Sequence, residues 1–362
     1  MTEDPRGNRW PITGVILASS TELGEFQMRS LALIAAVGLA CSALTTSAVA
    51  DPAQCTWQVS KVVTPDGYDP GFTKVLGTDS HGNYAGTSLR PGANTNDLIL
   101  WTGGKPQVVQ EVQHLQWLQM TGENSAGTVL VNGYLPAEGR WTALLYSGGH
   151  QGRGTLTEVT APAGYRLSNA IALNERGDVV GLGQRISDGQ EVGVLWSALA
   201  SGPQVFDTAA GVPEDLDDDG TVLLRSRDGK LPGYLWRGGQ LTPLADGGGK
   251  QSFVEAIRGG KVIGYQVEGS WPESQALLWD RDGNVQRIDQ GGTAFSINAG
   301  GLITGERDTM VGHEAVWQDT TYLGDLPYPD GVALVSELFV AGDDNTLFSA
   351  AGSAGPLRWT CV

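Results

Sequence analysis

The feature that most constrains the fold is a short apolar segment ending in Trp or Tyr, which recurs about every 43 residues. Seven copies end at Trp101, Tyr146, Trp196, Trp236, Trp279, Trp317 and Trp359. Trp57 fits as a partial copy ahead of them. Repeats of about 40–45 residues with four short strands each are typical of β-propellers. The sequence therefore predicts an all-β fold, a seven-bladed β-propeller over residues 51–362, with a β-sandwich or β-solenoid as the alternative.

Each repeat also contains a second marker, in which an apolar residue is followed by a short polar turn with Gly and then by an apolar strand, clearest at 173–181 and 297–303. The Trp-ending segment is one strand, and a Gly-rich turn leads to the next. A variable loop, a third strand, the Asn/Asp-Gly turn and a fourth strand complete the unit. Such turns need residues that accept positive φ, which accounts for 52 glycines in 362 residues. No sustained helical period appears in residues 51–362.

The two ends of this region complement each other. The segment at Trp57 corresponds to the strand after a Gly-rich turn, and the segment ending at Trp359 corresponds to the strand before one. Together they complete one blade whose connecting turn is interrupted, with Cys55 and Cys361 in its place. In an exported protein such a pair predicts a disulfide, here one that closes the ring.

Residues 28–50 have the pattern of a secretory signal peptide. Arg29 supplies a positive charge, an apolar run follows, and Ala48-Val49-Ala50 resembles a cleavage site. The run is too short for a membrane anchor, and Gly38 does not fit a lipoprotein signal at Cys41. Residues 1–27 are polar, and we interpret them as an upstream extension from a misassigned start. We expect an extracellular protein, 51–362, with no membrane association after cleavage.

Charge and motifs narrow the possible functions. The net charge of −17 and the pI near 4.5 argue against nucleic-acid binding, which needs basic surfaces. No nucleophile elbow, phosphate-binding loop or dinucleotide fingerprint occurs. We therefore expect no cofactor, and we expect a monomer.

The repeats resemble the HAF-type extracellular repeats of bacterial secreted proteins. The best matches are Gln275-Ala276-Leu277-Leu278-Trp279 and the turn at 173–177, and the resemblance extends over nearly all of 57–359. Gln275 stands where the family's namesake motif has His. The resemblance implies secretion and a repeat fold, without implying a particular chemistry.

Two further patterns suggest metal sites or catalysis. Residues 215–220 match the start of a calcium loop, but Ser226 occupies the closing position that a calcium loop gives to Glu. A hairpin turn is the simpler interpretation. His81, His114, His150 and His313 lie in different repeats without zinc spacing, so neither a metal role nor a general-base role is strongly indicated.

Aromatic residues outside the repeat period are the best candidates for ligand binding. The Trp-ending segments themselves are typical of core packing between blades. Because strands alternate in direction, the variable loops must share one face of the ring. They carry the predicted ligand-binding residues Tyr68, Tyr134, Trp141, Tyr165, Trp271 and Tyr328. We expect a non-catalytic module that binds an extracellular glycan or protein there. The alternatives are a propeller glycoside hydrolase or lyase that uses loop carboxylates, and a structural envelope protein.

Overall fold

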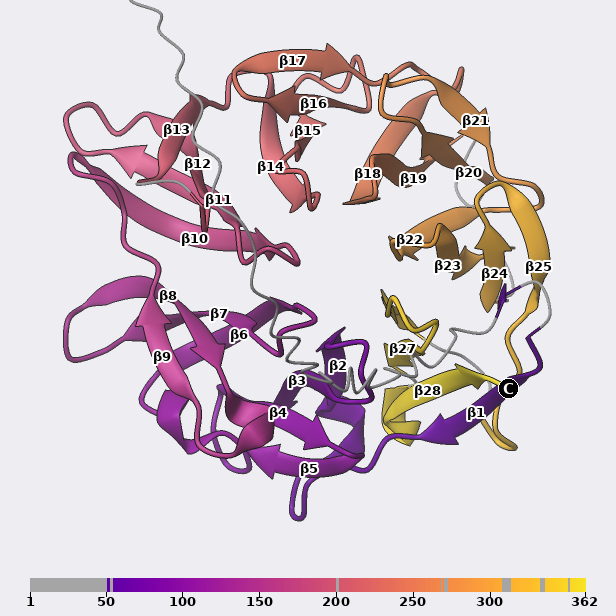
Figure 1. Cartoon of the computed structure of the whole chain (residues 1–362), viewed down its shortest axis with the longest axis horizontal. Helices are drawn as coiled ribbons and strands as arrows, with labels where there is room; N and C mark the ends of the chain where they lie inside the picture. Colours follow the sequence, from indigo (N-terminus) through magenta and orange to yellow (C-terminus); the bar gives the residue numbers. More distant parts are fainter. Residues whose placement is uncertain are drawn as a thin grey trace, which may run out of the picture. The chain divides into compact units, whose positions relative to one another are not determined.

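Each sequence repeat contributes to a four-stranded antiparallel sheet, and seven such sheets form a ring (Figure 1). The structure is a computed structural model that describes residues 51–52, 55–199, 202–267, 269, 273–307, 314–332, 336–350 and 352–362. The predicted seven-bladed β-propeller is confirmed. The proposed signal peptide and upstream extension lie outside the described residues, as does Trp271.

We number the blades 1 to 7 from β2 onwards, and each blade has an innermost, a second, a third and an outermost strand. The innermost strands are β2 (Lys74–Thr78), β6 (Gln116–Glu123), β10 (Tyr165–Leu173), β14 (Gly211–Leu216), β18 (Gln251–Arg258), β22 (Thr293–Ile297) and β26 (Ser336–Ala341). The second strands are β3 (Tyr84–Leu89), β7 (Val129–Leu135), β11 (Val179–Arg185), β15 (Val222–Ser226), β19 (Lys261–Val267), β23 (Leu302–Glu306) and β27 (Leu347–Ala350).

The third strands end near the recurring Trp or Tyr. They are β4 (Asn96–Thr102), β8 (Arg140–Ser147), β12 (Glu191–Trp196), β16 (Gly233–Arg237), β20 (Ser274–Trp279), β24 (Glu314–Gln318) and β28 (Pro356–Cys361). The outermost strands are β5 (Lys105–Val108), β9 (Thr155–Glu158), β13 (Gln204–Asp207), β17 (Gln240–Pro243), β21 (Val285–Arg287), β25 (Thr321–Asp325) and β1 (Trp57–Lys61). In the described part of the chain the helices are single 3₁₀ turns: η2 (Pro70–Phe72), η3 (Gln110–Val112), η4 (Gly149–Gln151) and η5 (Gly352–Ala354).

The ring closes through the two ends of the chain, as predicted. β1 pairs antiparallel with β28 and becomes the outermost strand of blade 7, with Trp57 opposite Cys361. Cys55 and Cys361 form a disulfide with their Cα atoms 4.9 Å apart. The bridge stands where the other blades have a turn between the third and outermost strands. The ring is therefore closed by both a hydrogen-bonded strand pair and a covalent bond.

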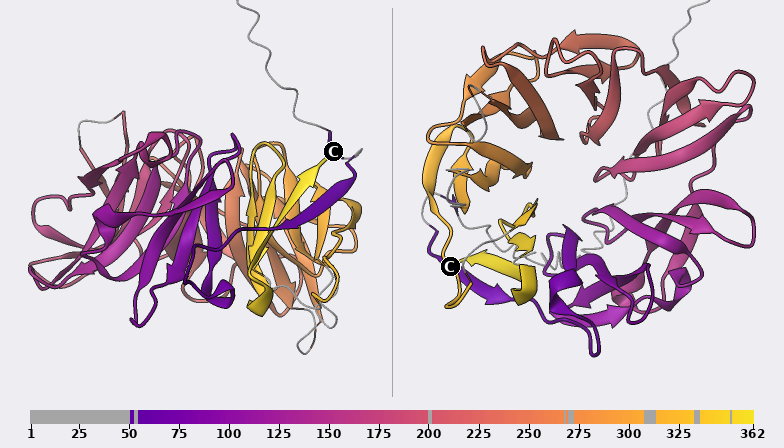
Figure 2. Two further views of the ribbon diagram at one scale, coloured as in Figure 1. Left: turned by 90° about the horizontal axis from the view of Figure 1, so that it is seen from below. Right: turned by 180° about the vertical axis from the view of Figure 1, so that it is seen from behind.

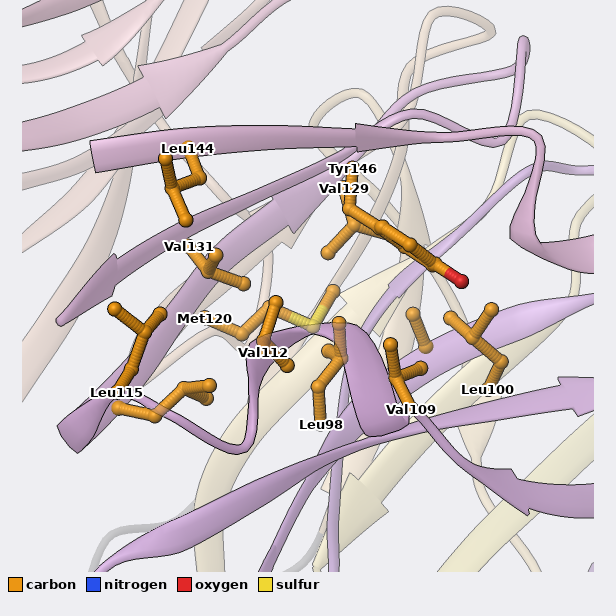
Figure 3. Packing of buried hydrophobic residues seen from close by; sticks show 12 residues of the cluster. Leu98, Leu100, Val109, Val112, Leu115, Met120, Val129, Val131, Leu144 and Tyr146 are labelled. Atoms are coloured by element: carbon orange, nitrogen blue, oxygen red, sulfur yellow. The ribbon is translucent and has the colours of Figure 1, made fainter. Parts of the chain in front are cut away.

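The core is divided among the interfaces between neighbouring blades. Figure 3 shows the interface between blades 1 and 2, where Leu98 and Leu100 of β4 face Met120 of β6 and Val129 of β7. Val112, from η3 in the connection between these blades, lies among them. Burial of such apolar side chains is the main contribution that holds one blade against the next.

The recurring Trp residues join consecutive blades in a second way. The indole nitrogen of an anchoring Trp donates a hydrogen bond to a carbonyl just after the outermost strand of the preceding blade. The donor–acceptor pairs are Trp101–Val63, Trp196–Thr160, Trp279–Ala245, Trp317–Asp289 and Trp359–Pro327, at 2.6–2.8 Å. All of these indoles except that of Trp196 are buried. The core-packing interpretation of the repeat is thus confirmed.

The Asn/Asp-Gly turns between innermost and second strands also interlock around the ring. Asn124 donates to the carbonyl of Asn174 at 3.2 Å, and Asn174 donates to that of Asp217 at 2.9 Å. The carboxylate of Asp217 accepts from the backbone of Gly259 and Gly260 at 2.8 and 2.7 Å. These turn residues therefore link blades 2, 3, 4 and 5 directly through hydrogen bonds.

The alternation of strand direction defines two faces. The short-turn face holds the turns after the first and third strands of each blade, together with the disulfide. The long-loop face holds the connections after the second and outermost strands. Figure 2 shows the ring from the side, with strands running between the two faces. Among the residues that the structure describes, no helix is long and apolar enough to span a membrane.

Candidate functional site

Two of the predicted ligand-binding residues lie together on the long-loop face of blade 2. Tyr134 near the end of β7 is paired with Trp141 near the start of β8. Trp117, at the start of β6, joins them. The ring centroid of Trp117 is 5.2 Å from that of Tyr134 and 5.9 Å from that of Trp141, and the last two are 5.9 Å apart. We call these three residues the aromatic platform.

The platform is open to solvent although it is made of large apolar rings. Trp117 is 51% exposed and Trp141 is 42% exposed, whereas most of the anchoring Trp residues are buried. Trp117 also has a positive φ of 51°, which is unusual for a bulky residue and is often found at functional sites. Exposed rings held in a fixed cluster are a surface on which a flat apolar ligand face can stack.

A groove next to the platform runs between blades 2 and 3. Its cavity has a volume of about 620 Å³, and Trp141, Arg140 and Glu158 of blade 2 face Arg166 and Leu167 of β10 across it.

Strands β6 and β10, which lie beside this groove, differ from the other innermost strands in their register. The innermost strand of every blade has one register shift near its turn, but each of these two has a second one, between Gln116 and Gln119 and between Leu167 and Asn169. Such bulges interrupt the ladder and reorient side chains.

Two of the charged side chains that line the groove, Arg140 and Glu158, are paired with each other. Arg140 bonds Glu138 at 2.6 Å and Glu158 at 2.5 Å, and Glu158 also accepts from the hydroxyl of Thr142 at 2.9 Å. Because Arg140 stabilises the carboxylate, the pKa of Glu158 lies below its ordinary value. Glu158 is therefore ionised at neutral pH and can accept hydrogen bonds from ligand hydroxyls.

The other predicted residues do not join the platform. The hydroxyl of Tyr68 donates to Asp97 at 2.6 Å, and burial together with that bond raises the pKa of Tyr68 to about 12. Tyr165 lies opposite Arg185 in the β10–β11 pair. The ring of Tyr328 packs against the core at the blade 6 and blade 7 interface. Tyr68 and Tyr328 therefore anchor loops within the fold.

Trp117 is the site residue that sequence analysis did not single out. The available signal was a Trp outside the 43-residue period, in a weak copy of the repeat. What could not be foreseen is that a second bulge in β6 would place its ring against Tyr134 and Trp141.

The candidate calcium loop is used for structure. Asp217 accepts from the backbone of blade 5, as described above, while Asp219 accepts from Thr221 at 2.9 Å. Asp215 accepts from Leu216 and Ile257, both at 2.8 Å. Burial raises the pKa of Asp215 to about 7, although these two N–H groups oppose the shift. Within the described ranges, no group of three His, Cys, Asp or Glu side chains is placed to hold a metal ion.

The three histidines that the structure describes, His81, His114 and His150, do not form a common site. The ring of His150 is buried, with Nε2 2.6 Å from Glu123 and Nδ1 2.9 Å from Thr102, so it ties blade 2 to blade 1. Burial raises the pKa of Glu123. His81 lies in a turn, where its Nδ1 is 2.6 Å from the carbonyl of Asp79, and His114 is exposed. His313 lies outside the described residues.

The central cavity at the short-turn face, about 220 Å³ in volume, is crossed by an ion cluster. Arg258 of β18 bonds Glu175 at 2.8 Å, Asp218 at 3.0 Å and Asp343 at 2.7 Å. These three carboxylates belong to the turns of blades 3, 4 and 7. One guanidinium therefore links four blades at the ring centre, which supports the rigidity of the face opposite the platform.

Burial of Glu314 on β24 predicts a pH-dependent stability. No other described residue donates a hydrogen bond to either carboxyl oxygen. Burial, helped by Glu306 opposite, raises the pKa of Glu314 from 4.5 to about 7, although its own backbone N–H opposes the shift. The folded state binds this proton more tightly than the unfolded state. Stability is therefore lost as pH rises from about 4.5 to about 7. We expect Glu314→Gln to gain on the order of 2 kcal/mol at pH 8, measured by urea unfolding.

The control for this prediction is the same comparison at pH 4, where both forms carry a neutral side chain and should unfold at similar urea concentrations. Equal stability of Glu314→Gln and wild type at pH 8 would contradict the raised pKa.

Comparisons with known proteins agree with the fold. No protein-family model matches the sequence, and no curated protein matches it. An oligogalacturonate lyase in complex with manganese is 10% identical over 85% of this chain and 94% of its own, with a TM-score of 0.55. The β-propeller domain of the Trilobed protease from Pyrococcus furiosus is 13% identical over 71% of this chain and 86% of its own, with a TM-score of 0.49.

TolB from Acinetobacter baumannii is 13% identical over 81% of this chain and 65% of its own, with a TM-score of 0.44. At 10% identity the likeness to the oligogalacturonate lyase concerns the fold alone. The resemblance to HAF-type repeats stays a prediction.

Proposed function

We propose that this protein is a secreted, non-catalytic β-propeller that binds an extracellular glycan through its long-loop face. The observation that carries the proposal is the aromatic platform, three clustered rings of which two are 51% and 42% exposed. Sugars present apolar C–H faces that stack on such rings, and their hydroxyls bond paired charged groups like Arg140 and Glu158. Exposed aromatic rings beside a concave, partly polar groove are a common form of ligand site.

The secreted location rests on the predicted signal peptide and is supported by the disulfide, which persists in oxidising compartments. A shared fold does not choose between binding and catalysis. The site itself favours binding, because Arg140 and Glu158 form an ion pair next to the stacking surface.

The first test is a thermal-shift screen of the oxidised 51–362 protein against soluble fragments of cell-wall and environmental glycans. A ligand at about 100 times its dissociation constant should add about 2.7 kcal/mol of apparent stability. We expect Trp141→Ala and Trp117→Ala each to weaken binding about tenfold or more, since each removes a stacking ring. Isothermal titration calorimetry measures the change.

Leu241→Ala is the matched control, because Leu241 is also an exposed apolar residue, at 45%, but lies on β17 of blade 4. Binding that survives both Trp substitutions would refute the platform. A shift with a protein ligand and with no glycan would favour a protein partner. Release of new reducing ends, lost in Glu158→Gln, would favour the alternative of a glycoside hydrolase or lyase.

A further inference from the structure

The aromatic platform lies between two cavities on the long-loop face. The groove between blades 2 and 3 includes Trp141 itself. A second cavity of about 500 Å³, between blades 1 and 2, is lined by Phe72, Asn96 and Gln119 among others. Gln119 follows Trp117 by two positions on β6, across the bulge between Gln116 and Gln119. The two cavities thus lie on the two sides of blade 2, and we call the two cavities together with the platform the path.

The far end of this path carries a fourth exposed ring. Phe72, at the end of η2, is 56% exposed and lines the second cavity. Its place is fixed by the N-terminal cap of η2, where Asp69 accepts from Gly71 at 2.9 Å. An exposed aromatic residue at each end and in the middle of one path suits a ligand longer than a single sugar.

Two of the three basic groups that line the cavities have partners within the protein. Lys74, Arg140 and Arg166 are the basic groups of the two cavities, and Glu138 and Glu158 face Arg140. Arg166 is itself hydrogen-bonded to Gln184 at 2.9 Å. Beyond the path, the whole chain carries a net charge of −17, which repels polyanions over long range. The path therefore matches an uncharged polymer better than a uronate or sulfated one.

The stereochemistry of the ligand follows from the stacking surfaces. A pyranose whose substituents are all equatorial exposes only axial C–H bonds on its two faces, so both faces are apolar. In a β-1,4-linked chain successive rings are rotated by half a turn about the chain axis. Because both faces of such a sugar are apolar, every ring can still stack on an aromatic side chain. Axial hydroxyls would interrupt that contact.

We propose that the site binds the interior of a neutral, β-1,4-linked polysaccharide chain with equatorial hydroxyls. This inference rests on the proposed function. The chain extends from the groove beside Trp141, over the platform, to an outer subsite at Phe72. The platform supplies the central contact, and Phe72 determines how much additional length contributes to affinity.

The test is titration calorimetry of the oxidised 51–362 protein with β-1,4-linked glucose oligomers of about two to six units. Affinity should rise with length until the path is filled. Phe72→Ala should weaken the longest oligomer about tenfold while leaving the shortest unchanged, since it removes one stacking ring. Trp141→Ala should weaken all lengths. Ile186→Ala is the control, because Ile186 is 67% exposed in a connection of the same face but lines neither cavity.

Each other outcome has a defined meaning. Affinity that is independent of length, or an equal loss at all lengths in Phe72→Ala, would overturn the extended path while leaving glycan binding intact. Tighter binding of galacturonate oligomers of equal length would overturn the neutral class. Binding of other glycans in the wider screen, without these oligomers, would overturn the stereochemical assignment. If no glycan of any kind binds, the proposed function itself fails.

Discussion

Trp279→Ala is expected to lower the free energy of unfolding by about 3–5 kcal/mol, the range for removing a large buried aromatic side chain. The indole of Trp279 is fully buried between blades 4 and 5, where it packs with Leu223 and Leu244. It also donates to the carbonyl of Ala245 at 2.7 Å. The substitution leaves a cavity and an unpaired carbonyl at the same interface. Urea unfolding followed by circular dichroism measures the loss.

Two matched variants separate these contributions. Trp279→Phe retains most of the apolar contact but removes the donor, so we expect a smaller loss of about 1–2 kcal/mol. Trp141→Ala truncates an exposed Trp and should change stability by less than about 0.5 kcal/mol. If Trp279→Ala were no more destabilising than Trp141→Ala, the recurring Trp could not be what joins the blades.

The second large effect concerns the closure of the ring. Replacing Cys55 and Cys361 together by Ser should lower the free energy of unfolding by about 2–4 kcal/mol. The bridge joins residues 306 positions apart, and it restrains the unfolded chain over that whole length. The variant keeps the β1–β28 hydrogen bonds, so the ring should still form, with β1 more easily released. Differential scanning calorimetry and limited proteolysis near β1 measure both effects.

Reductant provides the internal control for the disulfide. The double variant should unfold at the same temperature with and without dithiothreitol, and the wild type in dithiothreitol should approach the variant. Identical melting of oxidised and reduced wild type would show that the covalent closure contributes nothing to stability.

The repeat architecture could be predicted because it depends on local, recurring signals. A Trp at the end of an apolar segment and Gly in a turn are repeated in successive blades, and Gly177 and Gly220 adopt the positive φ that the pattern implies. The complementary ends and the cysteine pair then predicted how the ring closes. Each of these features can be identified from neighbouring residues without knowledge of distant contacts.

The site could be predicted only in part because its key contacts are not periodic. Tyr134 and Trp141 are visible as aromatic residues near a loop, but Trp117 joins them through a bulge and an unusual backbone angle that no short pattern specifies. The same holds for Arg258, whose partners in three other blades lie 40 to 85 positions away. Tyr68 and Tyr328 share the sequence context of Tyr134 but are used to anchor loops.

The position of the Cys55–Cys361 disulfide determines through which face the protein can be attached to a support. The strand ends that the disulfide joins lie on the short-turn face, while the aromatic platform lies on the opposite one. A linker fused after Val362 would therefore attach the ring to a bead, a cell surface or a second module with its ligand-binding side directed outwards. In this orientation the protein can be immobilised through its C-terminus while the surface proposed to bind a glycan stays accessible.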